Sequence, residues 1–170
     1  MRVIVLALAM AAAAPAATHY LTVTGLGGEP DYEQRFVGWA KDIGNALKDA
    51  GGGVQSQTLI APRREQLRRA LEELAQRAQP DDELVLMLIG HGTYDGHEYK
   101  FNLPGPDVTA EELAALLGRI PAKRQLVVNT SSASGASLKA LAGEGRLVIS
   151  ATRTGTEKNA TVFARYWAEA

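Results

Sequence analysis

Two polar residues follow apolar segments of the chain, and their side chains form a possible base and nucleophile. His91 lies between two glycines directly after the apolar run 84–89, and Ser132 follows the apolar run 126–128. An imidazole titrates near neutral pH and can take the proton of a hydroxyl, which can then attack a carbonyl carbon. For His91 taken alone, a histidine that merely ends a strand is the alternative interpretation.

The segments before these two residues have the composition of strands buried on both faces, as at the centre of a parallel sheet. In open α/β sheets, ligands bind where the carboxyl ends of the strands open into a crevice. If the two strands are neighbours, their ends lie about 5 Å apart. We therefore expect His91 and Ser132 to face each other across one crevice.

The rest of the chain alternates between strand and helix patterns. Strands are predicted at 19–24, 54–60, 84–89, 125–129 and 147–151, and helices at 31–49, 63–78, 110–117 and 136–141. Asp31 is placed to cap the first helix, Thr109 and Glu112 form a capping box for the third, and Asp95 lies in a short hairpin. This alternation predicts an α/β three-layer sandwich with a mostly parallel sheet of order 2-1-3-4-5.

Composition limits the possible functions. The chain has 170 residues, 46% of them hydrophobic and 22% charged, which suits one globular domain with a substantial core. Its net charge of −1 gives no electrostatic reason to expect nucleic acid or a membrane surface as a partner. It contains no cysteine, so this chain has no thiol nucleophile, thiolate metal site or disulfide.

Residues 1–16 have the pattern of a secretory signal peptide. Arg2 gives a basic start, 3–13 is apolar, and Ala14 and Ala16 supply small residues before a cleavage point near Ala16 or Ala17. The apolar stretch is too short to cross a bilayer comfortably, and a buried first element of the fold is the alternative. We expect an exported protein, periplasmic or secreted, whose domain spans 18–170. The amphipathic segment 159–170 ends without a cap, and we expect the natural protein to continue beyond it.

The order and context of the two motifs resemble the caspase-like cysteine peptidases, which include legumains, gingipains and caspases. Those enzymes carry a His-Gly pair after one strand and a nucleophilic Cys after the next, often as Cys-x-Ser-Gly. His91-Gly92 fits the first motif, and Ser132-Ala133-Ser134-Gly135 fits the second with Ser in the place of Cys. The legumain-like branch looks closest, and the resemblance covers the chain from Tyr20 onward.

The resemblance implies a role for each matching position. His91 would activate the nucleophile at position 132, and the Gly92 backbone amide would bind the oxyanion. The loop after the fifth strand would shape a specificity pocket, in which Arg153 or Lys158 could pair with an acidic ligand group. The implied substrate-binding residues are Arg153, Thr154, Lys158 and Ser134. A polar loop whose charges are simply solvated is the alternative.

The serine at position 132 changes the expected activity. A thiol has a pKa near 8.5, whereas a serine hydroxyl is a far weaker acid that needs an aligned base and a third group to orient that base. Asp95 is the only nearby acid with an obvious route to His91, and Ser132 lacks the Gly-x-Ser-x-Gly elbow of hydrolases. We therefore expect a catalytically inactive peptidase homologue whose cleft binds a peptide or a protein segment. The alternatives are an active serine-type peptidase or esterase using Ser132 and His91, and a flavodoxin-like ligand-binding module.

Other motifs point to no cofactor. The glycines in 25–28 follow the first predicted strand, but neither a dinucleotide fingerprint nor a Gly-Lys-Ser/Thr phosphate loop is present. The acidic run 81–83 is typical of a solvated turn, and the three histidines lack the spacing of metal ligands. We expect no cofactor, metal or nucleic acid, and no stable membrane span once the leader is removed.

Overall fold

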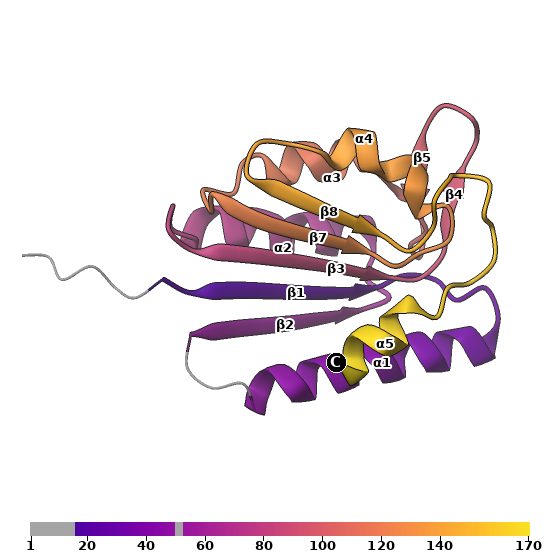
Figure 1. The fold of residues 1–170 in the computed structure, drawn as a ribbon, viewed down its shortest axis with the longest axis horizontal. Coiled ribbons are helices and arrows are strands. Elements are labelled where there is room, and N and C mark those ends of the chain that lie inside the picture. The colour runs from indigo at the N-terminus through magenta and orange to yellow at the C-terminus, as the bar shows by residue number, and fades with distance from the viewer. Residues whose placement is uncertain (1–15, 50–52) are drawn as a thin grey trace, which may run out of the picture.

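In the computed structural model, which describes residues 16–49 and 53–170, a five-stranded sheet has the order β2-β1-β3-β7-β8, and each neighbouring pair is parallel (Figure 1). Its strands are β1 (Thr18–Thr24), β2 (Val54–Ile60), β3 (Glu83–Ile89), β7 (Arg124–Asn129) and β8 (Arg146–Ser150). The predicted order 2-1-3-4-5 is confirmed, as is the α/β fold class. The predicted leader lies outside the described residues except for Ala16.

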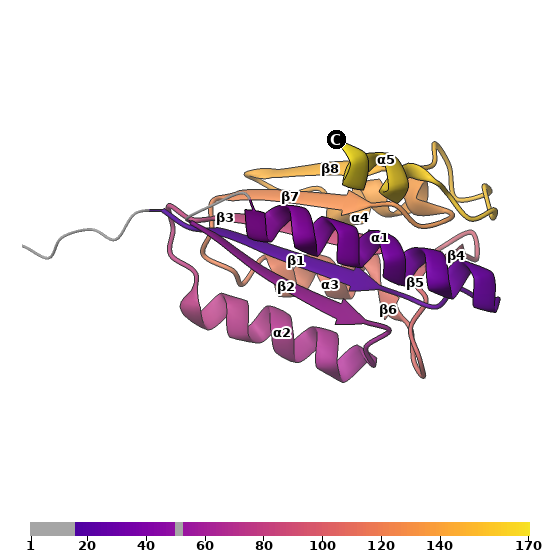
Figure 2. The same ribbon diagram turned by 90° about the horizontal axis from the view of Figure 1, so that it is seen from below.

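Helices cover both faces of the sheet, which makes the molecule a three-layer sandwich (Figures 1 and 2). One face packs against α2, α3 and α4, and the other against α1 and α5. The helices are α1 (Pro30–Asp49), α2 (Arg64–Arg77), α3 (Ala110–Leu117), α4 (Leu138–Leu141) and α5 (Phe163–Glu169). A second small antiparallel sheet contains β4 (Gly92–Tyr94), β5 (Tyr99–Phe101) and β6 (Val108–Thr109).

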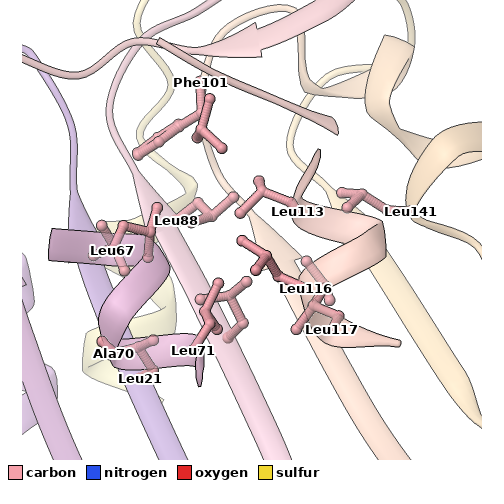
Figure 3. Close-up of a cluster of buried hydrophobic side chains, with 14 of the residues drawn as sticks. Leu21, Leu67, Ala70, Leu71, Leu88, Phe101, Leu113, Leu116, Leu117 and Leu141 are labelled. Atoms are coloured by element: carbon pink, nitrogen blue, oxygen red, sulfur yellow. The ribbon is translucent and has the colours of Figure 1, made fainter. Parts of the chain in front are cut away.

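The apolar run of β3 supplies both layers of the core, because successive side chains of a strand point to opposite faces. Leu86 and Leu88 pack on the side of α2 and α3, and Met87 and Ile89 on the side of α1. Figure 3 shows Leu88 between leucines of α2 and α3, with Phe101 of the small sheet above it. This central strand, hydrophobic on both faces, fixes the position of His91 at its carboxyl end.

Several local predictions need correction. The first helix begins at Pro30, so Asp31 lies in its first turn and is not the cap; the restricted backbone of proline suits the first helical position. Thr109 does cap α3, because its Oγ1 accepts from the Glu112 amide at 3.0 Å. The Glu112 carboxylate, however, does not complete the box; it binds Arg64 of α2 at 3.0 Å.

The segment after β7 also differs from its prediction. A continuous helix is expected at 136–141, but the chain forms a 3-10 turn at Ser134–Ser137 before α4. Ala133 precedes it in a left-handed conformation with φ of 55°. This sharp turn directly after Ser132 returns the chain over the end of the sheet.

Candidate functional site

The carboxyl ends of β3 and β7 lie side by side, as predicted. Leu88 pairs with Asn129, and the Thr130 amide donates to the Leu88 carbonyl at 2.8 Å. The β4–β5 hairpin lies beside these strand ends (Figure 1). The chain therefore delivers His91 and Ser132 to one place from two neighbouring strands.

His91 and Ser132 are in direct contact. The distance from His91 Nδ1 to Ser132 Oγ is 3.1 Å. Ser132 is buried, with 1% of its surface exposed, whereas His91 is partly exposed. The separation lies within the range of a nucleophile and its base, about 2.6–3.2 Å.

The Ser132 hydroxyl also binds both backbone groups of Gly92. Its Oγ accepts from the Gly92 N–H at 3.0 Å and donates to the Gly92 carbonyl at 3.0 Å. Gly92 pairs with Phe101 of β5, and the adjacent ladder bond runs from the Asn102 amide to the His91 carbonyl. Gly92 is therefore at a non-hydrogen-bonded position of the β4–β5 pair, so its N–H and C=O do not bind β5 and are available to Ser132. The hydroxyl thus takes the place of a neighbouring strand along the free edge of β4.

Only glycine fits at position 92. A Cβ atom there would lie 2.6 Å from the Ser132 carbonyl oxygen and 2.6 Å from the Tyr99 hydroxyl oxygen. Both distances are far inside van der Waals contact, so this glycine permits the close approach of β4 to the loop that carries Ser132.

Aromatic rings of α1 hold the imidazole of His91. The rings of Tyr32 and Phe36 meet it edge-on, with centroids 5.8 and 5.9 Å away. Within 16–49 and 53–170, no carboxylate forms a hydrogen bond or ion pair with His91. Asp95, the acid that the sequence suggests, instead accepts from the amides of His97 and Glu98, both at 2.9 Å, and these bonds lower its pKa.

A buried network of polar side chains lies next to Ser132. The Tyr99 hydroxyl lies 2.6 Å from Ser131 Oγ, and Ser131 Oγ donates to Asn129 Oδ1 at 2.8 Å. Burial raises the pKa of Tyr99 to about 12, so it remains a neutral phenol and a hydrogen-bond donor. This network orders the loop immediately before Ser132.

A pocket of about 270 Å³ opens above the pair. Its lining consists of His91, Gly92, Thr93, Tyr94, Asn102, Ser132, Ala133 and Lys158. Asn102 Oδ1 is buried and has no partner among the described residues, while its Nδ2 donates to Asp107 at 3.0 Å. The pocket thus places the cation of Lys158 beside the His91–Ser132 pair.

Four predicted site residues meet at this pocket, and three do not. His91, Gly92, Ser132 and Lys158 line it. Arg153 and Thr154 are exposed outside the lining, where their amides bind the Glu157 carboxylate.

Ser134 also lies outside the lining. It is fully buried, and its Oγ accepts from the Thr152 amide at 3.1 Å. The lining residues that sequence reasoning missed are Thr93, Tyr94, Asn102 and Ala133. Asn102 directly follows the short strand β5 and belongs to no motif.

Neither a metal centre nor a membrane span is found in the described part of the chain. No group of three or more His, Cys, Asp or Glu side chains there could hold a metal ion. No helix among the same residues is long and apolar enough to cross a bilayer.

The sheet order, with His91 and Ser132 at neighbouring strand ends, is that of a caspase-like α/β domain. Residues 37–156 match the family described as the caspase domain. The match covers more than half of the chain, and the protein therefore belongs to the caspase domain family. Closeness to the legumain-like branch stays a prediction.

Solved structures share this fold at low sequence identity. Protein GSU0716 from Geobacter sulfurreducens matches with a TM-score of 0.50 and 22% identity, over 69% of this chain and 51% of its own. Raptor from Chaetomium thermophilum matches with a TM-score of 0.53 and 13% identity, over 74% of this chain and 12% of its own. The Drosophila initiator caspase Dronc matches with a TM-score of 0.50 and 12% identity, over 79% of this chain and 55% of its own.

The chain thus spans about half of two of these proteins and a small part of the third. It matches no curated protein sequence.

Proposed function

We propose that this caspase-domain protein is catalytically silent and that its cleft binds a peptide segment. One observation carries the proposal: the hydroxyl at the nucleophile position is bound to both backbone groups of Gly92. A hydroxyl has one proton, and here the Gly92 carbonyl competes with His91 for it. When the carbonyl holds that proton, His91 Nδ1 can only donate to Ser132 Oγ and cannot act as its base.

The same contact occupies the expected oxyanion donor. An oxyanion hole works when backbone N–H groups are free to bind the oxygen that becomes negative in the transition state. The Gly92 N–H already donates to Ser132 Oγ. A tetrahedral intermediate would have to displace that bond, so the contact opposes both attack by the hydroxyl and stabilisation of the product of attack.

The surroundings of His91 support the same conclusion. Serine hydrolases orient the histidine with a third group, commonly a carboxylate that also stabilises the imidazolium. Tyr32 and Phe36 flank this imidazole with aromatic rings, and Asp95 is bound within its own turn. The imidazolium would therefore form without a compensating anion.

The pocket chemistry supports recognition of a peptide with an acidic side chain. Lys158 supplies a positive charge beside the pair. A carboxylate on the ligand would form a charge-assisted bond with this ammonium group. We propose an extended peptide segment carrying Asp or Glu as the occupant.

A working serine-type peptidase or esterase is the second candidate. The contact of 3.1 Å between His91 Nδ1 and Ser132 Oγ favours it, because apo enzymes show such distances before the substrate aligns the groups. This candidate requires the hydroxyl to leave the Gly92 carbonyl when a substrate binds.

Fluorophosphonate labelling separates the two candidates. We expect no covalent adduct on the full chain by intact-mass spectrometry, as for a Ser132→Ala control. A Ser132→Cys variant, with the more acidic thiol, should be alkylated by iodoacetamide and should cleave reporter peptides after Asp, Asn or basic residues. An adduct that disappears in Ser132→Ala would overturn the silent assignment in favour of the hydrolase.

Peptide binding tests the retained cleft separately. A fluorescent peptide library varying one residue among Asp, Asn and Arg should show the highest anisotropy with Asp. Lys158→Ala should weaken Asp binding about tenfold, the factor that corresponds to about 1.4 kcal/mol. Arg153→Ala is the matched control, because Arg153 is exposed on the same loop outside the pocket. Equal binding by both variants, or no binding at all, would contradict the proposed occupant.

A further inference from the structure

Ala17 is bound at the amino ends of the strands, at the end of the sheet opposite the cleft. The Ala17 amide donates to Asp82 Oδ1 at 2.8 Å, and the Ala17 carbonyl accepts from the Glu83 amide at 2.9 Å. Ala16 is exposed and forms no hydrogen bond with any described residue. Among the described residues, the Ala17 nitrogen is therefore the first atom along the chain that forms a hydrogen bond.

That nitrogen binds a buried carboxylate. Asp82 is 6% exposed, and its Oδ2 accepts from the Gln79 amide at 2.8 Å and lies 3.1 Å from His19 Nε2. The amides of Ala17 and Gln79 are the main cause of its lowered pKa, so the group is an anion at neutral pH. No Lys or Arg within the described ranges forms an ion pair with Asp82.

The sequence provides a cleavage pattern at this same nitrogen. For the bond between Ala16 and Ala17, Ala14 and Ala16 occupy the −3 and −1 positions that signal peptidases read, after the apolar stretch 3–13. Two independent features, a leader pattern and a buried carboxylate, thus converge on one atom.

We propose that the chain is cut between Ala16 and Ala17 and that the new α-amino group forms an ion pair with Asp82. A signal peptidase of the export machinery would hydrolyse the bond with water. The C–N bond breaks, the hydroxyl of water joins the Ala16 carbonyl carbon, and one hydrogen goes to the Ala17 nitrogen. The amine then takes a further proton from solvent. This inference is independent of what the cleft binds.

The contacts of the folded chain fit an α-amine at Ala17 better than one at the neighbouring positions. A separation of 2.8 Å suits an ammonium–carboxylate bond without movement of either group, and such charged bonds are about twice as strong as neutral ones. A cut one residue later would place the amine on Thr18, whose nitrogen already donates to the Gly53 carbonyl at 2.8 Å. An earlier cut would leave a neutral amide at Ala17. Of these positions, only a cut before Ala17 places an α-amine at the nitrogen that contacts Asp82.

N-terminal sequencing tests the cleavage. The full chain with its own leader is expressed in a bacterial host with a periplasm, and the exported protein is purified and sequenced. We expect Ala17 as the first residue. Retention of the leader, or a first residue other than Ala17, would overturn the proposal.

Amine reactivity tests the ion pair in the same processed protein. Acetylation of the α-amine, followed by mass spectrometry of the N-terminal peptide, should be slower in the folded protein than in urea, about tenfold for each unit by which the carboxylate raises the pKa of the amine. Asp82→Asn should abolish the protection, whereas Asp81→Asn at the exposed neighbouring residue should keep it.

If Asp82→Asn does not fold, the comparison of folded and urea-unfolded wild-type protein still decides the question. Equal acetylation rates in those two states would show that the amine is not paired, and the ion-pair proposal would fail.

Discussion

At the scale of single residues, position 132 has a structural role that a nucleophile would not need. The Ser132 side chain joins a loop after β7 to the backbone of β4, through one donated and one accepted bond. Both backbone groups of Gly92 depend on it, because Gly92 faces β5 at a non-hydrogen-bonded position. The hydroxyl is thus part of the framework of the site.

Removal of that hydroxyl should destabilise the protein. We expect Ser132→Ala to lower the free energy of unfolding by about 1–3 kcal/mol, since the N–H and C=O of buried Gly92 lose their partner. Ser132→Cys should fall between wild type and Ser132→Ala, because a thiol is a weak donor and acceptor. Urea denaturation followed by circular dichroism measures the series.

The control for this series is Ser56→Ala, at an exposed serine of β2 whose side chain forms no hydrogen bond in the described structure. It should change the free energy of unfolding by less than about 0.5 kcal/mol. A Ser132→Ala variant as stable as this control would mean that the bonds to Gly92 contribute nothing to folding.

At the scale of elements, the stability of α3 depends on the cap at its amino-terminal end. The helix has only 8 residues, and an isolated helix this short would not be stable in water. The cap from Thr109 satisfies the Glu112 amide, while the Glu112 carboxylate is left free to reach Arg64 on α2. One turn therefore both begins α3 and links the two helices that cover the same face of the sheet.

Loss of this cap should be measurable. We expect Thr109→Ala to reduce the free energy of unfolding by about 1 kcal/mol, the usual cost of removing such a cap. Thr109→Ser keeps the capping oxygen and should remain close to wild type in the same thermal or urea titration. If Ser and Ala variants lose stability equally, the effect belongs to the lost methyl group and not to the cap.

At the scale of the whole molecule, the sequence predicts the sheet well because its strands are marked by strong local signals. The apolar run of β3 and the turn residues before it locate the central strand within one residue, at Glu83–Ile89. Strand order then follows from alternation with helices, and the meeting of His91 and Ser132 follows from strand order. The strands, their order and the His91–Ser132 contact can therefore all be predicted from patterns of residues close together in the sequence.

Hydrogen bonds between a side chain and a distant backbone group have no such local pattern. The bonds from Ser132 to Gly92 depend on the fold of the β4–β5 hairpin, and the bond from Ala17 to Asp82 joins positions 65 residues apart. Asn102 enters the pocket for the same reason, since only the pairing of β5 brings it there. Sequence reasoning thus finds the His91–Ser132 pair and misses the hydrogen bonds that restrain Ser132.

The bridge between Ser132 and Gly92 has a consequence for how this scaffold could change over time. The small hairpin is attached to the main sheet at the very oxygen on which any hydrolysis would depend. If the proposed function is right, a variant with a reactive group at this position would loosen that attachment, and a variant that keeps the attachment would lack turnover. The Ser132 oxygen cannot both attach the hairpin and react with a substrate. We therefore expect variants of this protein to keep either the attachment or the reactivity, but not both.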